Sequence, residues 1–240
     1  MAVYAFTQVK GGAGTTTLAA NLANAWPNQG RVLLELAVGG GALARSMGYD
    51  TLPAATVENP AQGIYDFAVD QDRPKPLQGT DPSSWLLPVL PAPQIPDYPH
   101  PGEKMWWQQR VEFATGTDLD VICDLGPVAP EHLMIHNRIM NAATVVVAVV
   151  RNLHDARFAA KRLALYHDKL ALVMISPFRT LASEVSEAAG SACLQILPWD
   201  DAVAENLWRG ILLIEQKKQP KPVKEYASAV AELAEKIAGA

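Results

Sequence analysis

Short apolar runs recur along the chain, and within them apolar and polar residues do not alternate. Strands buried on both faces have this pattern, because helices cover both faces of a central parallel sheet. Helix-length segments separate the runs. The runs lie at residues 3–8, 31–36, 120–125, 144–150, 170–176 and 193–198, and the intervening segments at 16–26, 131–140, 155–167 and 200–209. This order predicts an α/β fold with right-handed crossovers and a mostly parallel, doubly wound sheet flanked by helices.

A proline-rich region interrupts this alternation between residues 53 and 102. Proline density alone is typical of a linker or a recognition tail. The apolar stretch at 83–93 instead favours a further strand followed by an irregular loop. Because 240 residues suit one α/β domain, we expect a single domain over 1–240, with 53–102 as an insertion-like region.

The C-terminal segment, residues 222–240, carries one apolar stripe at three- and four-residue spacing. The stripe consists of Tyr226, Val230, Leu233 and Ile237. This spacing predicts a helix packed on the domain. A membrane-surface helix is the alternative, but it would need larger apolar residues and more lysines on its polar face.

The net charge and the distribution of lysines limit the classes of partner that the protein is expected to bind. The net charge of −5 at pH 7 argues against a protein built chiefly to coat nucleic acid. Four lysines gather at the start of the C-terminal segment: Lys217, Lys218, Lys221 and Lys224. We expect a solvated connection there, with contact to DNA phosphates or to an anionic membrane surface as the alternative.

The sequence also indicates a compartment. No charged-then-apolar leader is visible at the N-terminus, and the longest apolar run, residues 142–150, is well short of the ~20 residues that a spanning helix needs. We therefore expect a cytoplasmic protein. Cys123 and Cys193 lie far apart in apolar contexts without metal-type spacing, so we expect buried thiols rather than a disulfide or a cluster ligand.

A glycine-rich loop follows the first apolar run, with the sequence TQVKGGAGTTTL over residues 7–18. Its glycines allow a tight turn whose backbone N–H groups point at one anion, next to the positive end of a helix dipole. A general phosphate-binding loop reads G-x-x-x-x-G-K-[ST], in which the lysine reaches the phosphates and the hydroxyl holds Mg²⁺. Thr15 stands at the lysine position and Thr16 at the hydroxyl position. The loop therefore predicts a phosphate site without its usual cation.

Lys10, directly before the glycines, makes the loop resemble the deviant Walker A motif K-G-G-x-G-K-[ST] of the MinD/ParA superfamily, which are SIMIBI-type P-loop NTPases. Other segments resemble the family in the same order. Residues 31–44 resemble its second strand and first switch, 120–127 its Walker B strand and second switch, and 196–210 the late stretch that encloses adenine. Residues 87–93 resemble a segment of the TadZ/CpaE-like branch, whose members localise pilus and secretion machinery.

This resemblance implies a site for ATP and Mg²⁺, with Thr16 as a metal ligand and Asp124 orienting the metal's water. The implied nucleotide-binding residues are Lys10, Gly11, Gly12, Ala13, Gly14, Thr15, Thr16, Thr17, Ser176, Pro198 and Asp200. Ser176 stands where many members have an asparagine that contacts the base, so that contact is open. Lys10 matches the lysine that reaches the partner's nucleotide, which implies a homodimer or a heterodimer with a homologous ATPase.

Two departures from the family pattern bear on hydrolysis. Thr15 removes one cationic contact to phosphate. In the first switch Glu35 replaces the first aspartate, and Ala37 replaces the second, which in relatives positions the attacking water. A register one residue later places Leu36 and Val38 there and restores neither carboxylate. Because phosphoryl transfer depends on positioning and charge neutralisation, we expect ATP binding with little or no hydrolysis.

The expected function is spatial positioning or assembly of a cellular machine, with recruitment to a pole or to a membrane-associated apparatus. The branch resemblance favours a pilus or secretion apparatus, while DNA or cargo partition stays open. An active ATPase is one alternative, in which Lys10 or a partner's arginine replaces the missing lysine. A nucleotide-free interaction module is another; its glycine loop would be only a structural turn, and Asp124 would cap a neighbouring helix.

Overall fold

The computed structural model describes residues 2–28, 30–37, 65–66, 88–90, 103–128, 133–208 and 221–239. Its strands are β1 (Val3–Gln8), β2 (Arg31–Glu35), β3 (Tyr65–Asp66), β4 (Pro88–Leu90), β5 (Asp120–Pro127), β6 (Val145–Val150), β7 (Leu170–Ser176) and β8 (Ala192–Pro198). Its helices are α1 (Thr15–Asn24), α3 (Glu103–Gly116), α4 (Leu133–Ala142), α5 (Leu153–Arg162), the 3-10 segment η4 (Ala164–Lys169), α6 (Ala182–Ala189), α7 (Asp201–Trp208) and α8 (Lys221–Ala238).

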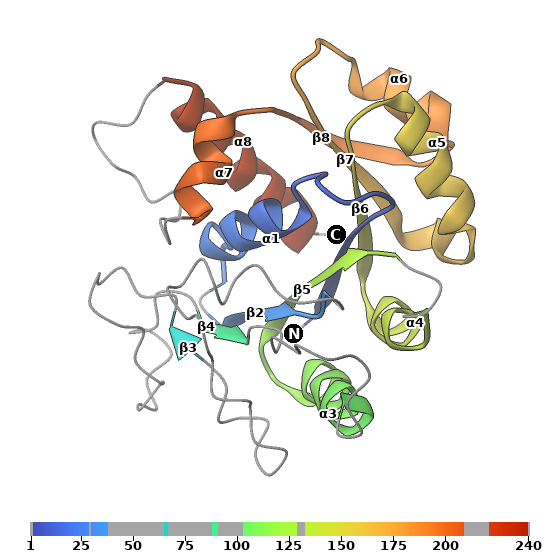
Figure 1. Cartoon of the computed structure of the whole chain (residues 1–240), viewed down its shortest axis with the longest axis vertical. Coiled ribbons are helices and arrows are strands. Elements are labelled where there is room, and N and C mark those ends of the chain that lie inside the picture. Colours follow the sequence, from blue (N-terminus) through green and yellow to red (C-terminus); the bar gives the residue numbers. More distant parts are fainter. Residues whose placement is uncertain are drawn as a thin grey trace.

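The strands form one sheet in the order β3-β4-β2-β5-β1-β6-β7-β8 (Figure 1). Every neighbouring pair is parallel except β3 with β4, which is antiparallel. β1 lies between β5 and β6, so parallel neighbours flank its carboxyl end on both sides. The predicted mostly parallel sheet is confirmed.

Helices cover both faces of the sheet, and the residues of β1 divide between the two layers. Tyr4 and Phe6 belong to one apolar cluster, together with residues of α1, α7 and α8. Val3 and Ala5 belong to a second cluster, together with residues of α3, α4, α5 and α6. Figure 1 shows these two groups of helices on opposite sides of the sheet. The doubly wound arrangement is thus confirmed, and its two buried faces explain why β1 reads as a continuous apolar run.

The helix expected over residues 155–167 is present as two pieces, so that expectation was wrong in its extent. α5 ends at Arg162, and η4 follows it. Within η4, Tyr166 leaves helical geometry with φ −112° and ψ 19°. Its ring is buried, and its hydroxyl donates to Asn137 Oδ1 of α4 at 2.8 Å. This anchor on α4 competes with a straight continuation of α5.

The predicted C-terminal helix is confirmed as α8. All four residues of its apolar stripe are buried, and α8 contacts α1 and β8. This packing favours a structural helix over a membrane-surface one. Lys221 and Lys224 are exposed on α8, whereas Lys217 and Lys218 lie outside the described residues. Among the helices described, none combines the length and the apolar character that crossing a membrane would require.

The strand expected within 83–93 is present as β4, which pairs with β2. Apart from 65–66 and 88–90, the proline-rich region 53–102 lies outside the described residues. A single domain over the whole chain stays a prediction.

Both cysteines are free thiols, but only one is fully buried as expected. Cys123 lies in the central strand β5 and is 0% exposed. Cys193 is half-buried, because β8 is the last strand of the sheet within the described residues. Burial raises the pKa of both thiols.

Candidate functional site

The glycine loop joins the carboxyl end of β1 to the start of α1 (Figure 1). Gly12 and Gly14 have φ angles of 78° and 88°, in the left-handed region that glycine enters without strain. Gly14 is the N-cap of α1, and the first turn of a helix has backbone N–H groups without intrahelical acceptors. In open parallel sheets, ligands bind at the carboxyl ends of the strands. The predicted loop therefore has the backbone geometry of an anion site.

Thr15, at the position of the usual lysine, is 1% exposed and bonded inside the loop. Its Oγ1 donates a hydrogen bond to Oε1 of Gln8 at 2.9 Å. The same oxygen accepts the backbone N–H of Ala13 at 3.0 Å. The loop therefore closes on a neutral carboxamide. Thr17 follows in the first turn of α1 and is half-buried.

Thr16 and Asp124, the predicted metal ligands, lie beside each other. Asp124 is 0% exposed, and its Oδ1 accepts the N–H of Gly126 at 3.0 Å. Burial raises the pKa of Asp124, and hydrogen bonding from the Thr16 side chain and the Gly126 amide offsets this effect only in part. Asp124 Oδ2 is buried without a hydrogen-bond partner among the described residues. A hydroxyl beside a buried, incompletely bonded carboxylate suits Mg²⁺, which prefers oxygen ligands.

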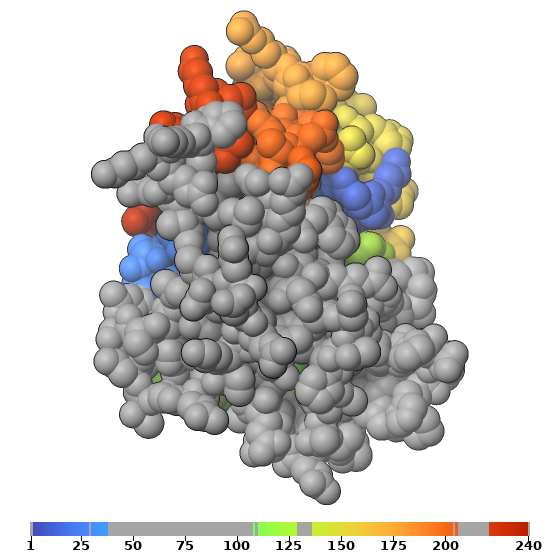
Figure 2. Space-filling model, turned by 60° about the vertical axis from the view of Figure 1, so that its left-hand side comes forward, coloured from blue at the N-terminus to red at the C-terminus, as the bar shows by residue number. Residues whose placement is uncertain are grey.

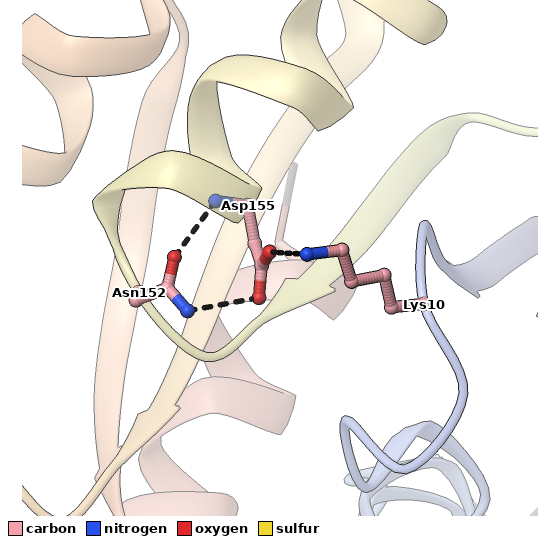
Figure 3. A network of polar contacts seen from close by, with 3 residues as sticks. All are labelled: Lys10, Asn152 and Asp155. Carbon is pink, nitrogen blue, oxygen red and sulfur yellow. Dashed lines mark hydrogen bonds and ion pairs between the residues drawn. The ribbon is translucent and has the colours of Figure 1, made fainter.

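Lys10 extends from the loop to the start of α5, as Figure 3 shows. Its Nζ lies 3.3 Å from Asp155 Oδ1, and the side chains of Lys10 and Asp155 are 62% and 8% exposed. Asn152 is the N-cap of α5 and accepts the Asp155 N–H at 2.9 Å. Asn152 Nδ2 also donates to Asp155 Oδ2 at 3.1 Å. The Asp155 carboxylate is thus held in place, and Lys10 pairs with it inside its own chain.

A cavity of about 300 Å³ opens beside the loop. It is lined by Val9, Lys10, Gly11, Ala13, Val149, Arg151, Asn152, Asp155, Pro177 and Phe178. In Figure 2, the blue N-terminal segment reaches the surface next to the yellow segment that contains α5. The guanidinium carbon of Arg151 also lies 4.8 Å from the centroid of the Trp199 ring. Of the predicted site residues, Lys10, Gly11 and Ala13 therefore line the cavity.

The three residues expected near the base lie at the ends of β7 and β8. Ser176 and Pro198 are register partners, and Asp200 directly precedes α7. Ser176 Oγ accepts the N–H of Phe178 at 3.1 Å, and Asp200 Oδ1 accepts the N–H of Ala202 at 2.8 Å. Both side chains hold local turns, and none of the three residues lines the cavity beside the loop.

The two switch segments meet at Gly126. Glu35 is the register partner of Asp124 and is buried. A Cβ built on Gly126 would lie 2.9 Å from the Cβ of Ala37. Ala37 is therefore in contact with the second switch, and its methyl group cannot orient a water. Residues 38–64, which follow it, lie outside the described residues.

Sequence reasoning missed several residues that the structure brings to the loop, namely Gln8, Asn152 and Asp155. Gln8 carried a signal, since it is a strongly polar residue at the end of an apolar strand. Asn152 and Asp155 have the three-residue spacing of a capping box, which marks a helix start. Neither signal indicates that the start of α5 lies next to the glycine loop. Asp124 forms no helix cap in the contacts described, contrary to the structural alternative considered for it.

No protein-family model matches the chain, and a search of curated proteins finds no match. Solved structures do match it over nearly its whole length. The cell division ATPase MinD from Pyrococcus furiosus is 21% identical, with a TM-score of 0.67 over 98% of both chains. A ParA family ATPase from Chlorobium tepidum is 18% identical, with a TM-score of 0.66 over 97% of both chains. MinD from Pyrococcus horikoshii, complexed with Mg-ADP, is 17% identical with a TM-score of 0.66, over 98% of this chain and 96% of that chain. The chain has the fold of the MinD and ParA ATPases.

Proposed function

We propose that the protein binds ATP with Mg²⁺ at the glycine loop, hydrolyses it slowly or not at all, and uses the bound state to position a cellular assembly. One observation carries this proposal: a loop with anion-binding backbone geometry lies next to a buried carboxylate that has an unbonded oxygen. A buried polar atom without a partner is costly and calls for an explanation. A cation bound beside Asp124 would account for this oxygen without a partner.

The chain provides separate groups for the phosphates and for the metal. Bound Mg²⁺ would supply charge neutralisation at the phosphates. Thr16 would ligate it through its hydroxyl, and Asp124 would orient its water ligand. The backbone N–H groups at the start of α1 would hold the phosphates. These roles need no lysine in the loop, so binding can persist without one.

Slow hydrolysis follows from Thr15 and Ala37. A hydrogen bond from a charged group contributes roughly 1.5–3 kcal/mol, and Thr15 supplies no charge. Its hydroxyl is also engaged by Gln8. Losing about 3 kcal/mol of transition-state stabilisation lowers a rate by more than a hundredfold. Ala37, in contact with Gly126, adds no carboxylate that could position water.

We further propose that ATP promotes association of two chains through the loop face, as a homodimer or as a heterodimer with a homologous ATPase. Lys10 would then reach the partner's phosphates. In the single chain Lys10 is paired with Asp155 at 3.3 Å, and its side chain is 62% exposed. Only the Lys10 end of the pair is exposed, so Lys10 can turn from Asp155 to a phosphate while Asn152 still holds the buried Asp155 carboxylate.

The positioning role draws on proteins that share the fold. Their names describe a septum site-determining protein and a MinC:MinD cell division complex. For this chain we propose pilus or secretion machinery as the assembly, because residues 87–93 resemble the TadZ/CpaE-like branch. The exposed Lys221 and Lys224 would contact DNA or a membrane surface in that setting.

Calorimetric titration with ATP, with and without Mg²⁺, tests the nucleotide part of this proposal. We expect Mg²⁺-dependent binding to the wild type, and a loss of at least tenfold in affinity in Thr16→Val, which keeps the shape but removes the hydroxyl. Thr115→Val, an exposed substitution on α3, should bind as the wild type does. Phosphate release should stay near the uncatalysed rate, and brisk turnover abolished by Thr16→Val would show an active ATPase instead.

The nucleotide-free interaction module is the second candidate, and one observation favours it. Gln8 already satisfies two donors of the loop, the Ala13 N–H and the Thr15 hydroxyl. Capture of a homologous chain by a protein that binds no ATP at saturating Mg²⁺ would support the module and refute the nucleotide proposal.

A further inference from the structure

The side chain of Gln8 is held in a fixed place under the glycine loop. Gln8 is the last residue of β1 and pairs in register with Pro127 of β5 and Val149 of β6. The backbone carbonyl oxygen of Gln8 accepts the N–H of Val128 at 2.9 Å, and the residue is only 8% exposed. The sheet therefore fixes the backbone from which the carboxamide reaches into the loop.

The carboxamide presents its oxygen to the loop. The Ala13 backbone N–H is only a donor, so the side-chain atom that it meets at 3.0 Å has to be the acceptor, Oε1. The Thr15 hydroxyl donates to the same Oε1 at 2.9 Å. Both contacts are buried. One oxygen of Gln8 thus receives two hydrogen bonds from the loop.

The oxygens of a bound phosphate would accept hydrogen bonds from the same two donors, the Ala13 N–H and the Thr15 hydroxyl. Phosphate loops bind by turning successive backbone N–H groups toward phosphate oxygens, and Ala13 lies between the two glycines with positive φ, Gly12 and Gly14. With its N–H given to Gln8, Ala13 can serve a phosphate only after that bond is broken. Thr15 is engaged in the same way.

We propose that Gln8 is an internal acceptor that competes with phosphate for the loop and so sets the affinity of the site. This inference rests on the proposed nucleotide site and deepens it. It also explains how the loop tolerates the loss of its lysine, since the Gln8–Thr15 pair supplies a neutral link across the same turn. A lysine at this position would add a positive charge that attracts phosphate, which Thr15 does not.

Titration with pyrophosphate and with ATP, each with Mg²⁺, tests the competition directly. Gln8→Met keeps the length of the side chain but removes the acceptor, and should bind both ligands about tenfold more tightly than the wild type, or about 1.4 kcal/mol. Gln8→Glu offers a stronger acceptor and a negative charge, and should bind at least tenfold more weakly. Gln108→Met, an exposed change on α3, should leave both affinities unaltered.

Thermal unfolding supplies a second measurement. Gln8→Met leaves the Ala13 N–H and the Thr15 hydroxyl without an acceptor, so its melting temperature should fall without ligand and rise more than that of the wild type when pyrophosphate is added. Gln8→Ala, which leaves more room, should behave in the same direction.

Clear results overturn the inference. If folded Gln8→Met and Gln8→Ala both bind pyrophosphate no better than the wild type, Gln8 does not compete with phosphate. A gain for ATP alone would have the same consequence, because the competition acts at the loop. Failure of the wild type to bind ATP would refute the proposed function, while tighter pyrophosphate binding in Gln8→Met would still support the competition.

Discussion

Replacing Asp124 with asparagine should stabilise the folded protein at neutral pH and remove the proposed Mg²⁺-dependent nucleotide binding. The reason lies in the surroundings of the carboxylate. Asp124 is 0% exposed, one of its oxygens has no hydrogen-bond partner within the described residues, and burial raises its pKa above the ordinary 3.8. A buried carboxylate held in this way is costly in the charged form that a metal site requires.

The expected gain in the stability of Asp124→Asn can be estimated from the contacts of Asp124. An unsatisfied buried polar group costs about 1–3 kcal/mol, and more when it carries charge. Asparagine keeps the acceptor for the Gly126 N–H but brings an amide group with its own need for partners, so we expect a net gain of about 1 kcal/mol. For a chain of 240 residues this corresponds to an increase in melting temperature of roughly 2–4 °C.

The gain should depend on pH with a defined sign. Because the folded-state pKa of Asp124 is raised, its contribution to stability is fully present below the ordinary pKa of 3.8 and is lost as the pH rises through the folded-state pKa. Asparagine does not titrate. The advantage of Asp124→Asn over the wild type should therefore grow with pH and disappear in acid.

Differential scanning calorimetry from acid to neutral pH measures this difference, first without ligand and then with ATP and Mg²⁺. At 100 times its dissociation constant a ligand stabilises a protein by about 2.7 kcal/mol, so saturating ATP should place the wild type above the variant. Asp168→Asn, at an exposed position, should melt with the wild type throughout. A variant less stable than the wild type at every pH would mean that Asp124 has a structural role and that its carboxylate is fully satisfied.

Four further substitutions test other contacts. Asp155→Asn frees Lys10 from its partner at 3.3 Å and should raise ATP-dependent self-association, measured by sedimentation, by up to about fivefold. Lys10→Ala should abolish this association. Unchanged association in both variants would refute a role of Lys10 across a dimer. Burial tends to raise the pKa of Asp120, but the hydrogen bonds that this carboxylate accepts outweigh burial and lower the pKa. The charged carboxylate therefore stabilises the fold above its ordinary pKa, and this stabilisation is lost as the pH falls through the folded-state pKa. Urea unfolding of Asp120→Asn should accordingly approach the wild type in strong acid, and a constant difference would contradict this. Gly126→Ala requires a strained φ of 62° and a Cβ 2.9 Å from that of Ala37, and should lower the free energy of unfolding by about 1–3 kcal/mol; an unchanged melting curve would argue against this close contact.

Much of the sheet could be predicted from the sequence because its strands are buried on both faces. The runs at 3–8 and 170–176 match β1 and β7 residue for residue. Burial on two faces favours apolar residues at successive positions of a strand, so the ends of an apolar run lie at or near the ends of the strand. The turn at the glycine loop was also predictable, since positive φ angles at Gly12 and Gly14 need glycine.

The contacts between segments could not be predicted in the same way. The helix start at Asn152 is visible as a local pattern, but the ion pair between Asp155 and Lys10 joins residues 145 positions apart through the parallel packing of β1 and β6. Strand order decides which loops meet, and apolar runs carry no information about that order. By the same limit, the sequence predicts Gln8 as the end of a strand but does not predict its hydrogen bond with Thr15.

The structure separates two properties that a phosphate loop usually combines. The turn depends on glycines and on the frame of β1 and α1, and these are present without a lysine. The positive charge that a loop lysine adds beside Mg²⁺ is absent, because a buried threonine bonded to Gln8 cannot provide it. Because the first property governs binding and the second weighs most in the transition state, affinity for ATP and the rate of its hydrolysis should respond to different substitutions in this chain. Changes at Gln8 should therefore alter affinity without restoring turnover.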